Sequence, residues 1–120
     1  MLVLDTHVLL HALNGQLTPK ERAVLSGESW SISAISLWEI AKLAQLGRVD
    51  IDLDDADVTR ALARVHTWPI TIEISRESTR LDFRGDPADE LIAATSIVHG
   101  AALATRDRAI RRSERVSLAW

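Results

Sequence analysis

Cysteine is absent from this chain of 120 residues. Without a thiol, the protein can form no disulfide, no thiolate nucleophile and no cysteine-ligated zinc site. The absence also fits a reducing compartment, and we expect the protein to be cytoplasmic. No apolar run approaches the roughly 20 residues that a membrane-spanning helix needs. The N-terminus lacks the positive region of a secretory signal, so we expect no membrane association and no export.

Glycine clusters and bulk positive charge are missing too. The five glycines are scattered, and none forms the loop that cradles a nucleotide phosphate. The formal net charge is −3, which does not suit a protein that coats nucleic acid through bulk charge. Acidic residues gather at 50–57, and we interpret that run as a solvated face. Arginine suits phosphate, so the basic stretch 106–115 supplies candidate contacts: Arg106, Arg108, Arg111 and Arg112.

The composition predicts one globular domain spanning residues 1–120. Hydrophobic residues make up 47% and charged residues 26% of the chain. Predicted strands alternate with predicted helices along the whole length. The expected strands are 2–5, 30–33, 69–73, 101–105 and 116–118, and the expected helices are 7–13, 19–27, 34–47, 54–65, 85–100 and a short basic helix before residue 116. This alternation predicts an α/β fold with a mostly parallel central sheet and helices on both faces.

Two aspartates lie at the carboxyl ends of predicted strands. Asp5 ends the apolar run 2–4, and Asp107 comes just after the strand at 101–105. Parallel α/β folds bind ligands outside the carboxyl ends of their strands, so both acids stand at the expected functional edge. Each has an alternative role, because aspartate also favours the N-cap of a following helix.

Three further acids lie on predicted helices. Glu39 falls on an apolar stripe, where a carboxylate is costly unless it is paired or binds a cation; a salt bridge to Lys42 is the alternative. Asp86 and Asp89 flank Pro87 at the start of the helix 85–100. Capping and the helix dipole could explain both, although Asp89 also lies beside the apolar side of that helix.

One acidic pocket is predicted from four of these acids taken together, which are Asp5, Glu39, Asp89 and Asp107. Four converging carboxylates repel one another unless a divalent cation neutralises them. All-oxygen ligation suits Mg²⁺ or Mn²⁺ rather than zinc, and such a site can activate water for attack on phosphorus. Other side chains offer less: the histidines lack metal-ligand spacing, the serines lack evident His or Asp partners, and the four tryptophans are assigned to the core or to an interface.

Several segments together resemble the PIN-domain proteins, and most of all their VapC-type toxins. They are LDTHVLLHAL, SAISLWEIAKLAQLGRV, DPADELIAATSIVHGAALATRD and the closing VSLAW. The resemblance covers essentially the whole chain. It departs at Glu90, where many relatives carry a basic residue, and at 84–85, where Arg-Gly replaces a histidine often seen nearby.

The resemblance implies an Mg²⁺- or Mn²⁺-dependent endoribonuclease. Asp5, Asp89 and Asp107 would hold the metal, and Glu39 would position the metal or the attacking water. Thr6 and Thr105 match small hydroxyl positions that support the pocket, and Asp86 is a further supporting candidate. The resemblance also implies RNA as substrate, a cognate antitoxin as inhibitor and a homodimer. We assign Leu9, Leu10 and Leu13 to an antitoxin groove, a dimer face or the core.

Two other functions remain open at this point. A phosphotransfer receiver-like domain would need a lysine near the pocket, but Lys20 and Lys42 are the only lysines, and neither follows a late strand. A non-catalytic binding module on the PIN fold predicts loss of the acids, and all four are present. Metal binding separates the module from the enzyme, because a bound ion stabilises the native state.

Overall fold

The computed structural model describes residues 1–120 and contains one parallel sheet. The strands lie in the order β3-β2-β1-β4, with bounds Leu2–Leu4 for β1, Trp30–Ser33 for β2, His66–Trp68 for β3 and Leu103–Ala104 for β4. Val3 lies opposite Ser31 on one side and Leu103 on the other. Leu118 adds a parallel bridge to Leu103. The predicted α/β fold with a parallel sheet is therefore confirmed.

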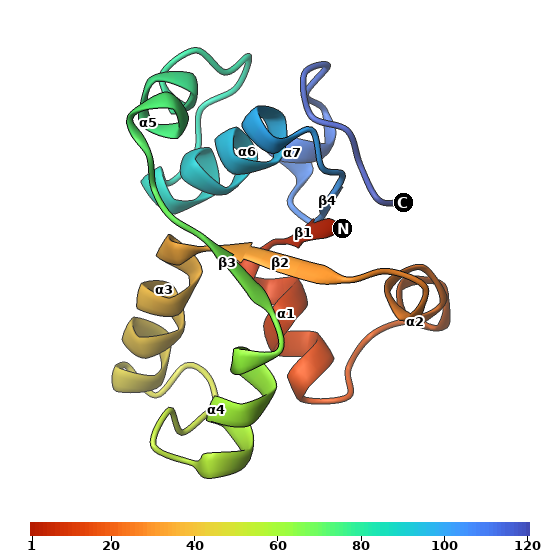
Figure 1. Cartoon of the computed structure of the whole chain (residues 1–120), viewed down its shortest axis with the longest axis vertical. Helices are drawn as coiled ribbons and strands as arrows, with labels where there is room; N and C mark the ends of the chain where they lie inside the picture. The colour runs from red at the N-terminus through yellow and green to blue at the C-terminus, as the bar shows by residue number, and fades with distance from the viewer.

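Helices cover both faces of the sheet. They are α1 (Thr6–Leu13), α2 (Pro19–Ser26), α3 (Ala34–Gln45), α4 (Ala56–Ala63), α5 (Ile72–Ser78), α6 (Pro87–His99) and α7 (Arg108–Arg111). In Figure 1, α5 and α6 lie above the sheet and α1, α3 and α4 lie below it, while α2 stands off to one side. None of these helices has both the length and the apolar character that crossing a bilayer requires.

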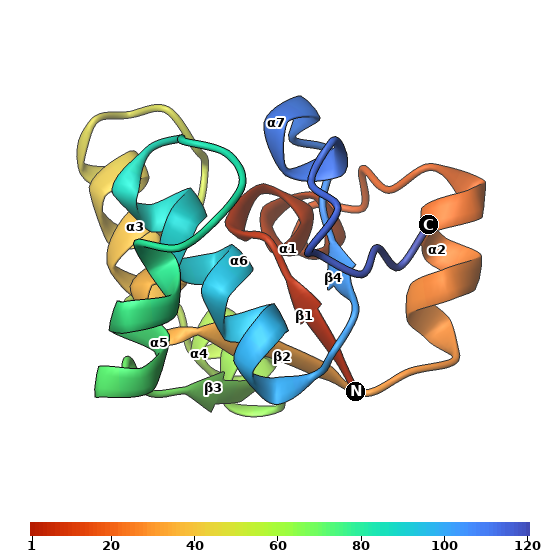
Figure 2. The same cartoon turned by 90° about the horizontal axis from the view of Figure 1, so that it is seen from above.

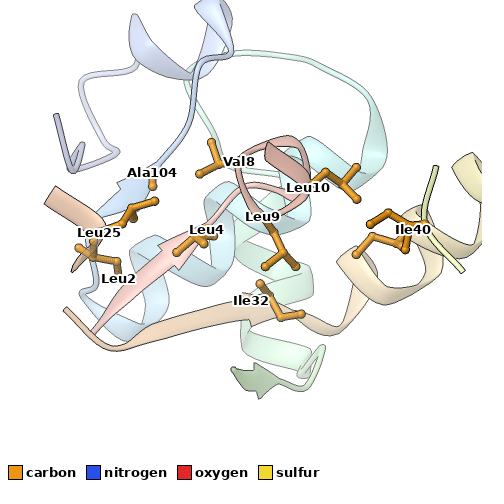
Figure 3. Close-up of a cluster of buried hydrophobic side chains, with 10 residues drawn as sticks. Leu2, Leu4, Val8, Leu9, Leu10, Leu25, Ile32, Ile40 and Ala104 are labelled. Carbon is orange, nitrogen blue, oxygen red and sulfur yellow. The ribbon is translucent and has the colours of Figure 1, made fainter. Parts of the chain in front are cut away.

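The central strand β1 supplies apolar side chains to two cores. Leu2 and Leu4 pack with α1 and β2, whereas Val3 packs with Ile92 of α6 on the opposite face. Figure 3 shows Leu4, Leu9 and Ile32 pointing toward one another between the sheet and α1. Because strand side chains alternate between faces, a three-residue strand buried on both sides must be apolar throughout. Leu9 and Leu10 are buried in this core, and Leu13 packs against it.

One predicted strand is wrong. Residues 69–73 alternate in polarity, but the strand is His66–Trp68, and α5 begins at Ile72. Thr71 caps that helix, since its hydroxyl accepts a hydrogen bond from the Ile74 amide at 3.2 Å. Pro69 has no amide hydrogen to donate to a strand ladder, which is consistent with β3 ending just before it. The strand predicted at 30–33 has the predicted bounds. The other predicted elements are present with ends that differ by one or more residues, and the final strand is reduced to the bridge at Leu118.

The connections at the carboxyl edge of the sheet are very short. One residue, Asp5, separates β1 from α1, and α3 follows β2 with no residue between them. Three residues separate β4 from α7, including Thr105 and Asp107. Figure 2 shows β1 and β4 running toward the edge where α1 begins and α7 lies. Short connections therefore bring polar residues from distant parts of the sequence to one edge.

An ion pair holds α2 to this edge of the fold. The Arg106 guanidinium donates to both carboxylate oxygens of Glu21, at 2.8 and 2.6 Å. Glu21 is buried and also forms a capping box with Thr18. The hydrogen bonds from Arg106 hold the pKa of Glu21 at about 2, well below its ordinary value.

We predict that Arg106→Ala lowers the free energy of unfolding by about 2 kcal/mol, because it leaves a buried carboxylate without its cation. Urea unfolding at pH 7 measures the change. Arg60→Ala is the control, since Arg60 pairs with Asp57 on the exposed surface of α4 and its loss should have no measurable effect. Equal stabilities of the Arg106 variant and the native protein would contradict the prediction.

Candidate active site

Asp5 is the most deeply buried acid at the carboxyl edge. Only 4% of the residue is exposed, and its side chain does not cap α1. One oxygen, Oδ2, accepts a hydrogen bond from the Thr105 hydroxyl at 2.6 Å, and the other, Oδ1, is buried with no partner. Burial raises the pKa of Asp5, although the Thr105 hydrogen bond and the nearby His7 lower it in part. The capping alternative is wrong for this residue, and Oδ1 is left as an acceptor that the protein does not use.

Glu39 is held by a chain of hydroxyl groups. The Thr6 hydroxyl lies 2.6 Å from Glu39 Oε1 and 2.8 Å from the Ser36 hydroxyl, and both hydroxyl residues are fully buried. An ionised carboxylate only accepts, so Thr6 donates to Glu39 and Ser36 donates to Thr6. The predicted alternative, a salt bridge to Lys42, does not form, because Lys42 donates to Gln45 instead. Burial raises the pKa of Glu39, and the charge of Asp5 raises it further.

Among the acids at this edge, Asp89 has the most strongly raised pKa. Its pKa is raised to about 7, first by burial and then by the charges of the surrounding acids, which are Asp5, Asp107, Glu39 and Asp86. Each of these four acids is therefore close enough to act on Asp89. The Asp89 side chain lies against Gly85 of the preceding loop, where a Cβ placed on the glycine would lie 3.7 Å from Asp89 Oδ2.

Asp107 and Asp86 both occupy N-cap positions but behave differently. Asp107 caps α7 through Oδ1, which accepts from the Ile110 amide at 2.9 Å, so its capping role is confirmed. Its charge nevertheless acts on Asp5 and Asp89. Asp86 precedes α6 without capping it, and its carboxylate is exposed. The capping alternative is therefore wrong for Asp86.

The structure brings all five acids to one edge, with their charges acting on one another. Thr105 connects two of them, since its hydroxyl donates to Asp5 and accepts from the Asp107 amide at 3.0 Å. As the side chains stand, no three His, Asp or Glu residues approach closely enough to hold one metal ion. Rotation of the partly exposed carboxylates would be needed to place three on one ion, with Asp5 already fixed in place.

The four arginine candidates divide into two pairs. Arg106 is engaged with Glu21, and Arg111 donates to the backbone carbonyls of Thr105 and Trp120 at 3.1 and 3.0 Å. These two side chains hold the fold together around the site. Arg108 and Arg112 lie on the exposed surface at α7 and form no ion pair. They are the arginines that are free to contact a ligand.

Two contributors were not expected from the sequence. Ser36 supports Thr6, and His7 lowers the pKa of both Asp5 and Glu39 through its charge. The sequence holds a partial signal for each, because His7 lies two residues after Asp5 and Ser36 lies three residues before Glu39 on one helix. The sequence does not show that Ser36 contacts Thr6, because the two residues are separated by 30 positions along the chain.

The comparisons with known proteins agree with the fold. The PIN-domain family model matches residues 2–116, so the chain belongs to the PIN-domain family. Within that family it is similar to Ribonuclease VapC22 of Mycobacterium tuberculosis, with 37% identity over 93 residues, which are 75% of this chain and 72% of that protein.

Solved structures show the same fold over nearly the whole chain. A toxin–antitoxin complex from Klebsiella pneumoniae matches with a TM-score of 0.75 and 19% identity, covering 100% of this chain and 98% of that one. VapBC2 from Rickettsia felis, bound to a DNA fragment from their promoter, matches with a TM-score of 0.70 and 17% identity, covering 97% and 95%. FitAcB from Neisseria gonorrhoeae matches with a TM-score of 0.68 and 21% identity, covering 98% and 96%.

The raised pKa of Asp89 predicts how stability depends on pH in EDTA. The native pKa of about 7 lies above the ordinary value of 3.8, so the native state binds this proton more tightly than the unfolded state does. The free energy of unfolding should therefore fall as pH rises from 5 toward 7 and level off above 7. Burial of Asp5 and Glu39 acts in the same direction.

Thermal unfolding at about pH 5 and pH 8 measures this dependence. Asp89→Asn should flatten the pH dependence and stabilise the protein at the higher pH. Asp52→Asn is the matched control, since Asp52 is an exposed acid away from the site. A melting temperature that rises between the two pH values would contradict the assignment of a repelling acid cluster.

Proposed function

We propose that this protein is a metal-dependent endoribonuclease of the VapC type, which hydrolyses RNA phosphodiester bonds at its acidic edge. One observation carries the proposal: a buried carboxylate with an unpaired oxygen lies among acids whose charges raise the pKa of Asp89 to about 7. Such a cluster weakens the fold unless a cation joins it. Membership of the PIN-domain family and similarity to a ribonuclease support RNA as the substrate.

The donor set suits Mg²⁺ or Mn²⁺. Every candidate ligand is a carboxylate oxygen, which is the donor type that these hard cations prefer. Asp5, Asp89 and Asp107 would hold the ion, with Asp5 Oδ1 as the oxygen that already lacks a partner. A bound divalent cation supplies charge for the scissile phosphate and a water molecule of lowered pKa.

The protein's own residues orient this chemistry. Thr105 fixes the Asp5 carboxylate by donating to Oδ2, which leaves Oδ1 directed elsewhere. Thr6, backed by Ser36, holds one oxygen of Glu39 and leaves the other without a hydrogen bond from the protein. Glu39 is thus placed to orient an attacking water, and the chain has no cysteine that could attack in its place.

We also propose a cognate antitoxin as partner and a homodimer as the assembled state. Structures that share this fold include toxin–antitoxin complexes, which supports an antitoxin partner. A basic antitoxin side chain placed near the acids would relieve their repulsion in the way that a cation does. Sedimentation velocity on the purified chain, alone and with the antitoxin, tests both assemblies.

The proposed reaction predicts metal-dependent RNA cleavage that depends on the acids. Purified protein is incubated with structured and single-stranded RNA in Mg²⁺, Mn²⁺ or EDTA. Cleavage should occur with either cation and stop in EDTA. Asp5→Asn, Glu39→Gln and Asp89→Asn should each lower the rate by at least about a hundredfold, because each removes a carboxylate that would hold the cation or orient the attacking water. Asp52→Asn should cleave as the native protein does.

Thermal unfolding separates loss of catalysis from loss of structure. The acid variants should melt at or above the native temperature, because they relieve repulsion. Mg²⁺ or Mn²⁺ should raise the melting temperature of the native protein but not that of Asp5→Asn. An unmoved melting temperature, together with an Asp5→Asn variant that matches the native protein in every assay, would favour a non-catalytic binding module.

Arg108 and Arg112 are predicted to contact RNA phosphate. Replacing both with alanine should weaken RNA binding in EDTA and reduce the slope of log affinity against log salt by about 0.7 for each phosphate that the protein no longer neutralises. Arg60→Ala, an exposed arginine on α4, is the control. An unchanged slope would leave the pair as solvated surface.

A further inference from the structure

A cavity of about 550 Å³ lies between the first turns of α3 and the start of α6. Its walls are mostly apolar, formed by Ile35, Trp38, Pro87, Ala88 and Leu91. The charged groups in its lining are the carboxylates of Glu39 and Asp86. Because Glu39 also belongs to the acid cluster, the cavity opens directly beside the candidate active site. A ligand that fills it would lie next to the reacting phosphate.

Trp38 gives this cavity an exposed aromatic wall. The sequence assigns its tryptophans to the core or to an interface, but Trp38 is 56% exposed. It immediately precedes Glu39 on α3. Exposed aromatic side chains beside a nucleic-acid channel serve as stacking surfaces, because every nucleobase presents a flat π-face.

Asp86 gives the cavity an unused acceptor. Its carboxylate neither caps α6 nor enters an ion pair, whereas one oxygen of Glu39 already accepts from Thr6. The charged lining therefore accepts hydrogen bonds and donates none when both acids are ionised. It repels phosphate and acidic peptide groups, and it favours a flat, uncharged ligand with N–H donors on one edge.

We propose that this cavity binds one unpaired nucleobase of the RNA substrate, stacked on Trp38 with its donor edge toward Asp86. The inference rests on the proposed ribonuclease function and names a determinant of its specificity. Guanine presents two neighbouring donors, N1–H and the N2 amine, which match the two oxygens of one carboxylate. Adenine and cytosine offer one amine, whereas uracil offers one N–H between two carbonyl oxygens that a carboxylate repels. The expected order is guanine first and uracil last.

Binding in EDTA tests the proposal without cleavage. Fluorescence anisotropy compares short single-stranded RNA oligonucleotides that are identical except for one guanine, adenine, cytosine or uracil in a run of uridines. The native protein should bind the guanine oligonucleotide at least about tenfold more tightly than the uracil one. Trp38→Ala should remove about tenfold of the guanine affinity, because the base no longer has an aromatic ring to stack on. Trp38→Phe should restore most of it.

Asp86→Asn should reduce the preference for guanine over adenine. Leu46→Ala is the matched control for Trp38, because Leu46 is an apolar residue at the opposite end of α3 with 62% exposure. Equal affinities for all four oligonucleotides, or variants that leave the preference unchanged, overturn the proposal. A Trp38→Ala variant that turns a dimer into a monomer but keeps the base preference also overturns it and assigns the cavity to a second copy of the chain.

Cleavage of the same oligonucleotides with Mg²⁺ or Mn²⁺ separates this inference from the proposed function. Cleavage at a rate independent of the varied base, in the native protein and in the Trp38→Ala and Asp86→Asn variants, rejects the base site and supports the ribonuclease. A guanine preference in binding, with no cleavage under either cation, supports the base site and rejects the ribonuclease.

Discussion

A carboxylate buried at the end of the central strand is the constraint on which the site depends. Asp5 has 4% exposure, one hydrogen bond from Thr105 and one oxygen with no partner. A buried charge is costly in free energy unless other groups stabilise its ionised form. The hydrogen bond from Thr105 and the charge of His7 offset part of this cost, whereas the charge of Asp107 adds to it. Burial and the same acid cluster raise the pKa of Asp89 to about 7. The fold thus sustains a cluster of acids whose mutual repulsion a bound cation or a basic side chain of a partner would relieve.

The parallel sheet explains how such an arrangement can persist. Leu2 and Leu4 pack in one core and Val3 packs in the other. Packing on both faces therefore fixes β1, which positions Asp5 immediately after it. The chain passes from β1 to α1 through that single residue, and Arg111 fixes the backbone at Thr105 by donating to its carbonyl oxygen. Rigid apolar elements on either side therefore offset the free-energy cost of the acids between them.

The same architecture divides the edge into two chemical surfaces. The acids that follow β1, lie at the start of α6 and precede α7 form one repelling cluster, while Trp38 and the start of α6 form an apolar cavity whose charged groups are acceptors. Glu39 belongs to both surfaces. Arg108 and Arg112 lie on the α7 side without ion pairs, which separates the positive charge from the acceptor cavity.

The sequence by itself determined the class of fold and the candidate acids. Apolar runs that end in Asp5 and Thr105 indicate buried strands, and Pro87 and Gly100 mark the ends of α6, because these signals are local. The strand expected at 69–73 failed for a local reason too, since Pro69 and the Thr71 cap compete with an alternating pattern. The acids could be named from their positions, whereas their partners could not.

Only the tertiary structure decided what each acid does. Asp5 and Asp107 both lie between a strand and the helix that follows it, yet Asp107 caps its helix and Asp5 does not. Thr6 reaches Glu39 across 33 residues, and Thr105 reaches Asp5 across 100. Arg106 and Arg111 serve the fold, whereas Arg108 and Arg112 stay free. Burial, hydrogen bonding and charge repulsion depend on which residues are in contact. The pairing of strands from distant parts of the sequence decides which contacts form.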